Sequence, residues 1–167
     1  MTGELGFRPA IASDWPLIWP FWRQIVADGD TYCYDPAMSY DAGRRLWFGA
    51  PPDQVWLVTD DSESTVLGSY RLGPNKGGPG AHIGTASYMV SAAARGRGVG
   101  RAMVVHCLDQ AGAAGYRGIQ FNAVAASNTH AVKLYLELGF KVIGTVPGGF
   151  AHPQQGFVDL LIMFRDL

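Results

Sequence analysis

The sequence predicts a fold of the α/β or α+β class, in which helices pack against a mixed sheet. The chain has 167 residues, of which 48% are hydrophobic and 16% charged, so one core can form without disulfides or a structural metal. Helical spacing dominates the first third, and short β-rich runs then alternate with helical segments. We expect a single domain over residues 1–167, with the order β-α-α-β-β-β-α-β-α-β-β.

A short strand and two helices are predicted in the first third of the chain. Ser13 can cap the first helix, Pro16 suits its first turn, and Pro20 should bend it. The apolar residues of this helix are spaced by three or four and share one face: Trp15, Ile18, Phe21, Trp22 and Ile25. A second helix is expected over 39–48, ended by Gly49 and two prolines.

Three strands are predicted next. The runs 55–58 and 65–70 are rich in β-formers, and the polar stretch from Asp60 to Ser64 between them indicates a hairpin. Residues 73–80, GPNKGGPG, have little to bury and are expected to form a loop. A third strand is expected over about 82–90.

Helices and strands alternate in the remainder. A helix over 98–114 is indicated by apolar residues at every fourth position, Val99, Met103, Cys107 and Ala111, and should stop at Gly115. A strand over 119–124 precedes a helix over 128–138, for which Asn128 is the expected N-cap. Strands over 140–146 and 157–164 follow, with a loop over 147–156 between them.

Charge and composition exclude several function classes. The net charge is −1, but residues 1–63 hold ten acids against four arginines, and the remainder holds nine basic residues against four acids. A near-neutral chain is a poor nucleic-acid binder, although a local site for one anionic small molecule stays open. Two cysteines make no disulfide framework, and we expect neither a secretory signal nor a membrane span. The expected location is the cytoplasm.

The most informative segment follows the predicted strand 82–90. Gly96, Gly98 and Gly100 leave three alternate positions without side chains in a turn that leads directly into a helix. Such a turn exposes backbone N–H groups at the positive end of a helix dipole, and Arg95, Arg97 and Arg101 add positive charge. The segment predicts a phosphate site, most simply for a pyrophosphate.

Spacing separates this turn from other phosphate-binding motifs. No lysine followed by a hydroxyl residue comes after the glycines, as a P-loop requires, and Arg101 stands where a dinucleotide fingerprint has its third glycine. A nucleotide-dependent oxidoreductase is therefore disfavoured. The pattern present is Arg-x-x-Gly-x-Gly, at Arg95, Gly98 and Gly100.

This pattern resembles the pyrophosphate-binding turn of the GCN5-related N-acetyltransferase family. Residues 128–140, NTHAVKLYLELGF, resemble the second signature of that family, Asn-x-x-Ala-x-x-Leu-Tyr-x-x-x-Gly-Phe. The resemblance implies a mostly antiparallel sheet of about six to seven strands flanked by about four helices. It divides the chain into an acceptor-side region, 1–80, an acetyl-CoA-binding core, 81–146, and a C-terminal loop and strand, 147–167.

The resemblance also implies roles for individual residues. Met89 and Val90 would bind the pantetheine arm, and the N–H of Val90 would act as the oxyanion donor. Asn128 would contact the cofactor, and Tyr135 would be the general acid for the leaving sulfur. A thiol ionises near pKa 8.5 and a phenol near about 10, so a tyrosine suits that role. The turn residues expected to hold the pyrophosphate are Arg95, Gly96, Arg97, Gly98, Val99, Gly100 and Arg101.

A narrower resemblance concerns the acceptor. Residues 120–124, QFNAV, and the segment 147–159 resemble acetyltransferases of proline analogues such as azetidine-2-carboxylate, in which Asn122 would line the cofactor and substrate cleft. Alternatively Asn122 is a polar residue at a strand end. The resemblance thus implies an acetyl-CoA-dependent N-acetyltransferase of a small amine, amino acid or proline analogue, acting by direct attack in a ternary complex. The alternatives are a non-catalytic acyl-CoA sensor and an enzyme that acetylates a protein or peptide amine.

The general base is left open. Asp159, His152, His82 and a relayed water are all candidates, whereas His106 and His130 are expected at the surface. The four histidines show no metal-ligand spacing, so no metal is expected.

The acceptor site is expected in the first part of the chain, which holds all five tryptophans. Together with Tyr32, Tyr34 and Tyr40 and the acidic excess, these residues suggest an aromatic-walled pocket for a cationic amine. The simpler interpretation is that most tryptophans fill the core, at least Trp19, Trp22 and Trp56. The family resemblance also suggests a homodimer.

Overall fold

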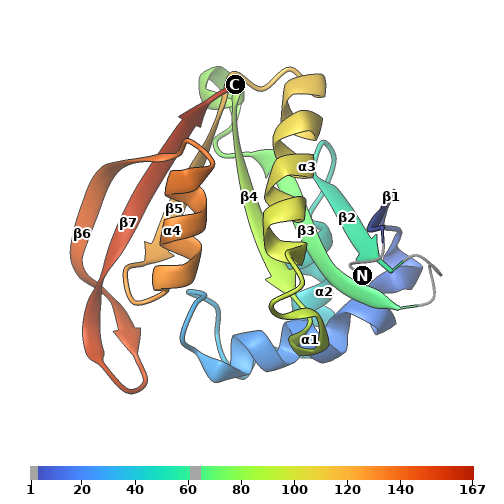
Figure 1. Ribbon diagram of the computed structural model, residues 1–167, viewed down its shortest axis with the longest axis horizontal. Coiled ribbons are helices and arrows are strands. Elements are labelled where there is room, and N and C mark those ends of the chain that lie inside the picture. Colours follow the sequence, from blue (N-terminus) through green and yellow to red (C-terminus); the bar gives the residue numbers. More distant parts are fainter. Residues whose placement is uncertain (1–3, 61–64) are drawn as a thin grey trace.

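The computed structural model describes residues 4–60 and 65–167 and contains a seven-stranded sheet in the order β1-β2-β3-β4-β5-β7-β6 (Figure 1). The elements are β1 (Gly6–Pro9), α1 (Trp15–Asp28), α2 (Tyr40–Phe48), β2 (Gln54–Thr59), β3 (Val66–Pro74), β4 (Ile83–Val90), α3 (Val99–Ala113), β5 (Gly118–Ala125), α4 (Thr129–Glu137), β6 (Lys141–His152) and β7 (Gly156–Asp166). Neighbouring strands are antiparallel except β4 and β5, which are parallel. The predicted fold class and element order are confirmed.

Helices cover both faces of the sheet, with α3 and α4 in front of the strands in Figure 1 and α1 and α2 behind them. Successive side chains of a strand point to opposite faces, so neighbours in β2 belong to different cores. Leu57 packs with Trp15 and Trp22 on the α1–α2 side, whereas Val58 packs with Met103 of α3 on the other side. The sheet therefore separates two apolar layers.

The start of α1 differs from the prediction. Ser13 lies in a 3-10 turn over Ala12–Asp14, and Asp14 is the N-cap residue of the helix. The Asp14 carboxylate accepts hydrogen bonds from both Arg8 guanidinium nitrogens at 2.8 Å and from the Ile11 N–H at 2.9 Å. Arg8 lowers the pKa of Asp14, so this carboxylate is charged at neutral pH. Helix α1 continues through Pro20 to Asp28.

The strands β2 and β3 pair antiparallel, as the hairpin prediction requires. Residues 61–64 of the predicted connection lie outside the described residues. The expected loop 73–80 begins later than predicted, because Gly73 and Pro74 still pair with Thr85 and Gly84 of β4. A 3-10 turn at Gly78–Gly80 follows.

The bounds of α3 and α4 agree closely with those predicted from the local sequence pattern. The four residues at every fourth position of α3 are buried, and Gly115 adopts a left-handed φ of 86° just beyond the helix. The N–H of Tyr116 bonds the Ala111 carbonyl at 3.0 Å, which closes the helix end in a Schellman arrangement. The Asn128 side chain accepts a bond from the Ala131 N–H at 3.3 Å, so Asn128 is confirmed as the N-cap of α4.

The predicted loop over 147–156 is wrong. Strand β6 runs on to His152 and pairs with β7 as far as His152 and Gly156. A register shift between Val146 and Phe150 accommodates the intervening Pro-Gly-Gly segment, and Gly148 takes a φ of 59° there. Phe150 is only 5% exposed and packs with Ala125 and Leu160, which anchors the extended hairpin to β5.

Candidate active site

The parallel strands β4 and β5 diverge in the middle of the sheet. Of these two fully described strands, only Ile83 with Gly118 and Gly84 with Ile119 are paired. Residues 85–90 of β4 and 120–125 of β5 extend beyond this short ladder; we call these two segments the wedge. The backbone of β4 on this side is consequently available to groups other than β5.

The hydroxyl of Tyr32 occupies one position on this open edge of β4. It accepts a hydrogen bond from the Tyr88 N–H at 3.2 Å and donates one to the Tyr88 carbonyl. The Ser91 N–H instead points to β3, where it bonds the Leu67 carbonyl. Because strand residues alternate in direction, the Val90 N–H faces the same side as that of Tyr88, into the wedge.

The glycine-rich turn lies directly beyond Val90. Gly96 and Gly98 both have a left-handed φ of 76°, and Gly98 is the N-cap residue of α3. A Cβ added to either glycine would meet no described atom within 4 Å, so the space above the turn is open. Ala94 and Val99 are 1% exposed on either side of the turn and hold it in place. The arrangement presents the N-terminus of α3 to an anion.

The three arginines of the turn differ in their contacts. Arg95 and Arg97 are exposed on the turn. Arg101, in the first turn of α3, forms an ion pair with Glu137 of α4, and Lys133 lies 4.0 Å from the same carboxylate. The structure therefore links α3 to α4 through a residue that the sequence predicted only as a phosphate ligand. Both partners are about half exposed, so the pair adds little stability.

Tyr135 projects from α4 into an aromatic group beside the wedge. Its ring lies 4.6 Å from Phe121 of β5, 5.7 Å from Phe140 and 6.4 Å from Tyr88, measured between ring centroids. Burial raises the pKa of the Tyr135 phenol well above its usual range. The hydroxyl is therefore protonated at neutral pH and is available as a hydrogen-bond donor.

Tyr32 and Tyr135 approach the wedge from opposite faces of the sheet. Tyr32 comes from the segment between α1 and α2, and Tyr135 from α4. Burial, followed by the neighbouring Tyr135 and Tyr34 phenols, raises the pKa of Tyr32. Sequence reasoning placed Tyr32 only in a general aromatic wall, because no local signal reveals a contact with a residue 56 positions away.

Polar side chains lie along β5 and at its end. Asn122, on β5, donates a hydrogen bond to the Asn75 side chain at 2.6 Å and accepts one from Gln120 at 3.0 Å. The Ser127 hydroxyl, next to the N-cap Asn128, is buried and has no partner among the described residues. An orphaned buried hydroxyl beside a helix N-terminus is a ready contact for a bound molecule.

The candidate bases occupy three different places. His82 lies just before β4, beside the closed end of the ladder and away from Val90. The His152 ring accepts hydrogen bonds from the N–H groups of Gln154 and Gln155 at the tip of the β6–β7 hairpin. Asp159 accepts one from the Gly148 N–H at 2.9 Å, and its own carbonyl bonds Ala126 just after β5. Of the three, only Asp159 adjoins the open end of the wedge.

Two expectations about side-chain placement need correction. His106 is half-buried rather than at the surface: its ring stacks on Phe7 at 4.2 Å and its Nδ1 lies 2.6 Å from the Tyr70 hydroxyl. The fully buried tryptophans are Trp15, Trp22 and Trp47, whereas Trp19 and Trp56 are only partly buried.

The acceptor-side aromatics form a continuous stack. Tyr32 stacks on Tyr34 at 5.2 Å, and Tyr34 stacks on Trp22 at 6.0 Å. Tyr40 packs against Trp15 and Trp19, which both contact Trp22. Two of the expected carboxylates already have arginine partners, Asp14 with Arg8 and Asp53 with Arg71.

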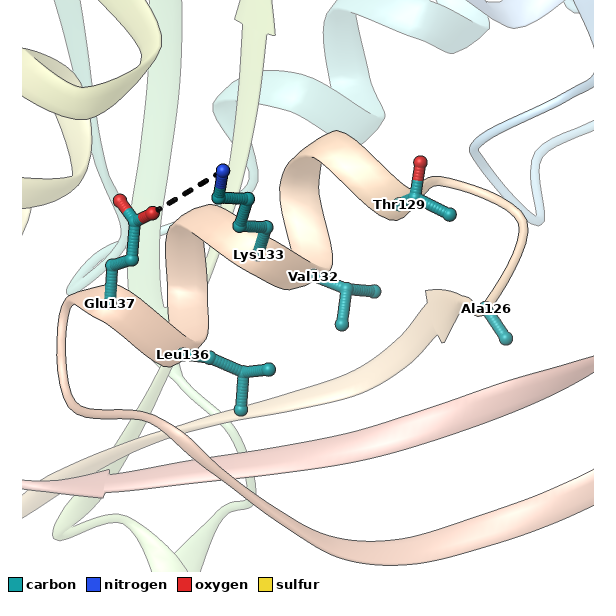
Figure 2. Close-up of a pocket in the computed structure, with 6 residues that line it drawn as sticks. All are labelled: Ala126, Thr129, Val132, Lys133, Leu136 and Glu137. Atoms are coloured by element: carbon teal, nitrogen blue, oxygen red, sulfur yellow. Dashed lines mark ion pairs between the residues drawn. The ribbon is translucent and has the colours of Figure 1, made fainter.

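A separate groove of about 360 Å³ lies along the side of α4, and its lining is mainly apolar (Figure 2). Val132 and Leu136 project into it, whereas Lys133 and Glu137 point toward one another across the helix surface. The remaining lining residues are Ala126 and Thr129. None of the wedge residues 85–90 and 120–125 lines this groove, so the groove is distinct from the wedge.

Residues 4–60 and 65–167 contain neither a candidate metal site nor a helix that could span a membrane. No group of three or more His, Cys, Asp or Glu in these ranges could hold a metal ion. No helix in them is both long and apolar enough to cross a membrane.

Comparison with known proteins identifies the family. The profile of the acetyltransferase (GNAT) family matches residues 19–140, which include the wedge, the glycine turn and α4. The chain belongs to this family. As a GNAT protein it is an acetyl-CoA-dependent acyltransferase.

Individual relatives agree with the GNAT assignment. The chain is 52% identical to a GCN5-related N-acetyltransferase from Kribbella flavida, with a TM-score of 0.93 over 98% of both chains. It is 28% identical to the N-acetyltransferase aca1 of Schizosaccharomyces pombe, over 80% of this chain and 71% of that protein. A phosphinothricin acetyltransferase from Sinorhizobium meliloti, solved in complex with AcCoA, shares the fold at 22% identity, with a TM-score of 0.84 over 100% of this chain and 89% of that one.

Proposed function

We propose that this GNAT enzyme transfers an acetyl group from acetyl-CoA to the amine of a small molecule, of the amino acid or proline-analogue class, by direct attack in a ternary complex. The observation that carries the proposal is the wedge, which places the open edge of β4 between a glycine turn and a partly buried tyrosine. A backbone edge, an anion site and a phenolic donor are the parts that this chemistry needs.

The residues around the wedge fit the proposed donor. Gly96 and Gly98 leave open space above the N-terminus of α3, which suits a pyrophosphate. Arg95 and Arg97 would add positive charge there, with Val99 and Gly100 completing the turn. Ser127 offers an unpartnered hydroxyl at the start of α4.

Further along the wedge, Met89 and Val90 would contact the pantetheine arm through the β4 backbone. Asn128 would contact it from α4 through the amide nitrogen, since the side-chain oxygen already caps the helix. For Arg101 we propose a phosphate contact that requires it to leave Glu137.

The chemistry is one acyl transfer. Acetyl-CoA supplies a thioester: a C–N bond to the acceptor forms, the C–S bond breaks, and the amine loses one proton while the sulfur gains one. The Val90 N–H would donate a hydrogen bond to the carbonyl oxygen, where negative charge develops. The Tyr135 hydroxyl, which is protonated at neutral pH before the reaction, would donate its proton to the departing sulfur and then regain one from solvent.

The acceptor must lose a proton before it attacks. We propose that Asp159 or a water beside it takes this proton, because Asp159 adjoins the open end of the wedge. His82 and His152 are placed less suitably. Replacement of Asp159 by Asn distinguishes the carboxylate from a water molecule as the base. The variant should lose its activity near neutral pH if the carboxylate is the base, and should keep most of its activity if a water molecule is the base.

The acceptor class is proposed from the surroundings of the wedge. The Tyr32–Tyr34 stack offers aromatic faces to an ammonium group, and Asn122 with its partner Asn75 offers amides to a carboxylate. Small amino acids carry both groups. A protein amine is the second candidate, and the site contacts above do not favour it.

A homodimer is part of the proposal. Strand β6 is an edge of the sheet, and its Val142, Ile143 and Val146 are exposed; Phe157 of β7 is 82% exposed. Exposed apolar edges usually need a cover, and a second copy is the simplest one. Light scattering should give twice the chain mass, and Ile143→Lys should shift it toward the monomer; a monomeric wild-type chain would contradict this.

The test of the proposed function is release of free CoA thiol from acetyl-CoA in the presence of an amine panel. The panel should contain small amino acids, proline analogues, a peptide with a free N-terminus and a polyamine. We expect amine-dependent thiol release with the small amino acids or proline analogues, together with a mass gain of one acetyl group on the acceptor. Release with the peptide or polyamine alone would overturn the acceptor class.

A further inference from the structure

Tyr32 forms hydrogen bonds with backbone groups of β4 in the wedge. The proposed transfer step does not use these groups. We propose that Tyr32 sets the length of the acyl group that the enzyme accepts, because its phenol fills the wedge next to the proposed carbonyl position at Val90. This inference rests on the proposed function, and it assigns a specificity-determining role rather than a bond-making one.

The order of residues along β4 supports this role. The glycine turn follows Val90, and the β4–β5 ladder closes at Gly84. From the turn toward the closed end, Val90 therefore comes first and Tyr88 second, about 6.7 Å deeper at the rise of a strand. The Tyr32 hydroxyl is bonded at Tyr88. An acyl chain longer than acetyl, extending from the Val90 position toward the closed end, would run against the phenol.

Tyr32 is held firmly in that place. Its hydroxyl bonds both the N–H and the carbonyl of Tyr88, and its ring stacks on Tyr34, which in turn stacks on the fully buried Trp22. If the phenol moved aside, the N–H and the carbonyl of the partly buried Tyr88 would both lose their hydrogen-bond partner. The phenol is therefore expected to resist displacement by a longer chain.

Aromatic rings also pack closely beside the wedge on the other face of the sheet. Tyr135 and Phe121 pack there with ring centroids 4.6 Å apart, and Phe140 stacks on Phe121 at 4.5 Å. Close packing on that side leaves Tyr32 as the side chain whose removal creates room beside Tyr88. The expected preference is for acetyl over longer acyl groups.

The test compares acetyl-CoA with butyryl-CoA in two substitutions. Tyr32→Ala removes the ring, and Tyr32→Phe removes only the hydroxyl. We measure kcat/KM with one amine for both thioesters and, without amine, the Kd of both by calorimetry. Tyr32→Ala should raise the butyryl-to-acetyl ratio of kcat/KM about tenfold, as expected for two newly accommodated methylenes, and should lower the butyryl-to-acetyl ratio of Kd values. Tyr32→Phe should keep both ratios near those of the wild-type enzyme.

Tyr40→Ala is the matched control. It removes the same side chain from the same aromatic region, where Tyr40 packs on Trp15 and Trp19 instead of β4. It should leave the acyl ratios unchanged. If thermal melting shows that Tyr32→Ala does not fold, Tyr32→Leu replaces it with a smaller loss of packing.

Unchanged ratios in a folded Tyr32→Ala or Tyr32→Leu enzyme would overturn the proposal. Equal tightening of both thioesters by Tyr32→Phe would also overturn it, because the hydroxyl would then compete with the CoA arm and not with the acyl chain. The Kd ratio needs no turnover, so a wild-type enzyme that acetylates none of the amines would refute the proposed function while still reporting on Tyr32.

Discussion

Replacement of Gly98 by Ala tests the proposed phosphate site, and Gly115→Ala is its matched control. Gly98 caps α3 at its N-terminus with a φ of 76°, and Gly115 follows the C-terminus of the same helix with a φ of 86°. A Cβ at either position would meet no described atom within 4 Å. Gly98→Ala and Gly115→Ala therefore impose the same kind of backbone strain at opposite ends of one helix.

The two substitutions should cost similar stability. A left-handed residue with a Cβ costs about 1–2 kcal/mol, and each kcal/mol lowers the Tm of a chain of this size by about 2–4 °C. Only Gly98→Ala also puts a methyl group into the space proposed for a phosphate. If one charge-assisted hydrogen bond is lost, worth about 1.5–3 kcal/mol, the Kd for acetyl-CoA should rise between about tenfold and about 150-fold.

The assay is calorimetric titration of both variants with acetyl-CoA, alongside thermal melting. We expect equal losses of Tm, with a raised Kd for Gly98→Ala and a nearly wild-type Kd for Gly115→Ala. Equal Kd values for the two variants would refute the assignment of the phosphate site to the N-terminus of α3.

Four other substitutions address separate parts of the structure. Tyr135→Phe should lower kcat about 10²- to 10⁴-fold with little change in the Kd for acetyl-CoA; unchanged kcat would remove its proposed role. Burial lowers the pKa of His106, so the unfolded chain binds more protons there and the folded state loses stability as the pH falls below about 6.5. His106→Gln should therefore flatten the fall in Tm between pH 7 and pH 5, and an unchanged slope would contradict this. Gly43→Ala would bring a Cβ to 2.9 Å from Trp22 and should cost about 1–3 kcal/mol in urea unfolding, whereas exposed Gly112→Ala on α3, with open space, should gain about 0.5–1 kcal/mol; equal effects would refute the packing argument.

The parts of the fold that depend on near neighbours were predictable from the sequence. The Asn128 cap and the Gly115 helix end each involve residues a few positions apart, so the local pattern contains the whole interaction. Capping of α1 was not predictable in the same way. Asp14 is the N-cap residue, but its carboxylate bonds no N–H of the helix and instead binds Arg8 of β1.

The extent of the β6–β7 hairpin depended on tertiary pairing. Pro147, Gly148 and Gly149 are typical of a loop, yet a register shift lets β6 continue because Phe150 is buried against β5 and β7. Composition alone cannot distinguish a loop from a strand with an irregularity of this kind.

The two motifs of the candidate site could be predicted from the sequence, but the spatial arrangement of its residues could not. Their spacing located the turn and α4, whereas the partners that complete the site are distant in sequence. Tyr32 reaches Tyr88 across 56 positions, Arg101 reaches Glu137 across 36, and Asn122 reaches Asn75 across 47. Only the folded sheet, with its diverging strands, brings these pairs together.

The central claim is that the wedge holds the thioester between Val90 and Tyr135 with the pyrophosphate on the turn before α3. A crystal structure of the enzyme with acetyl-CoA tests it most directly. We expect pyrophosphate oxygens within hydrogen-bond distance of the backbone N–H groups of residues 96–100, and the sulfur within reach of the Tyr135 hydroxyl. A pyrophosphate bound away from this turn, or a sulfur beyond the reach of Tyr135, would contradict it.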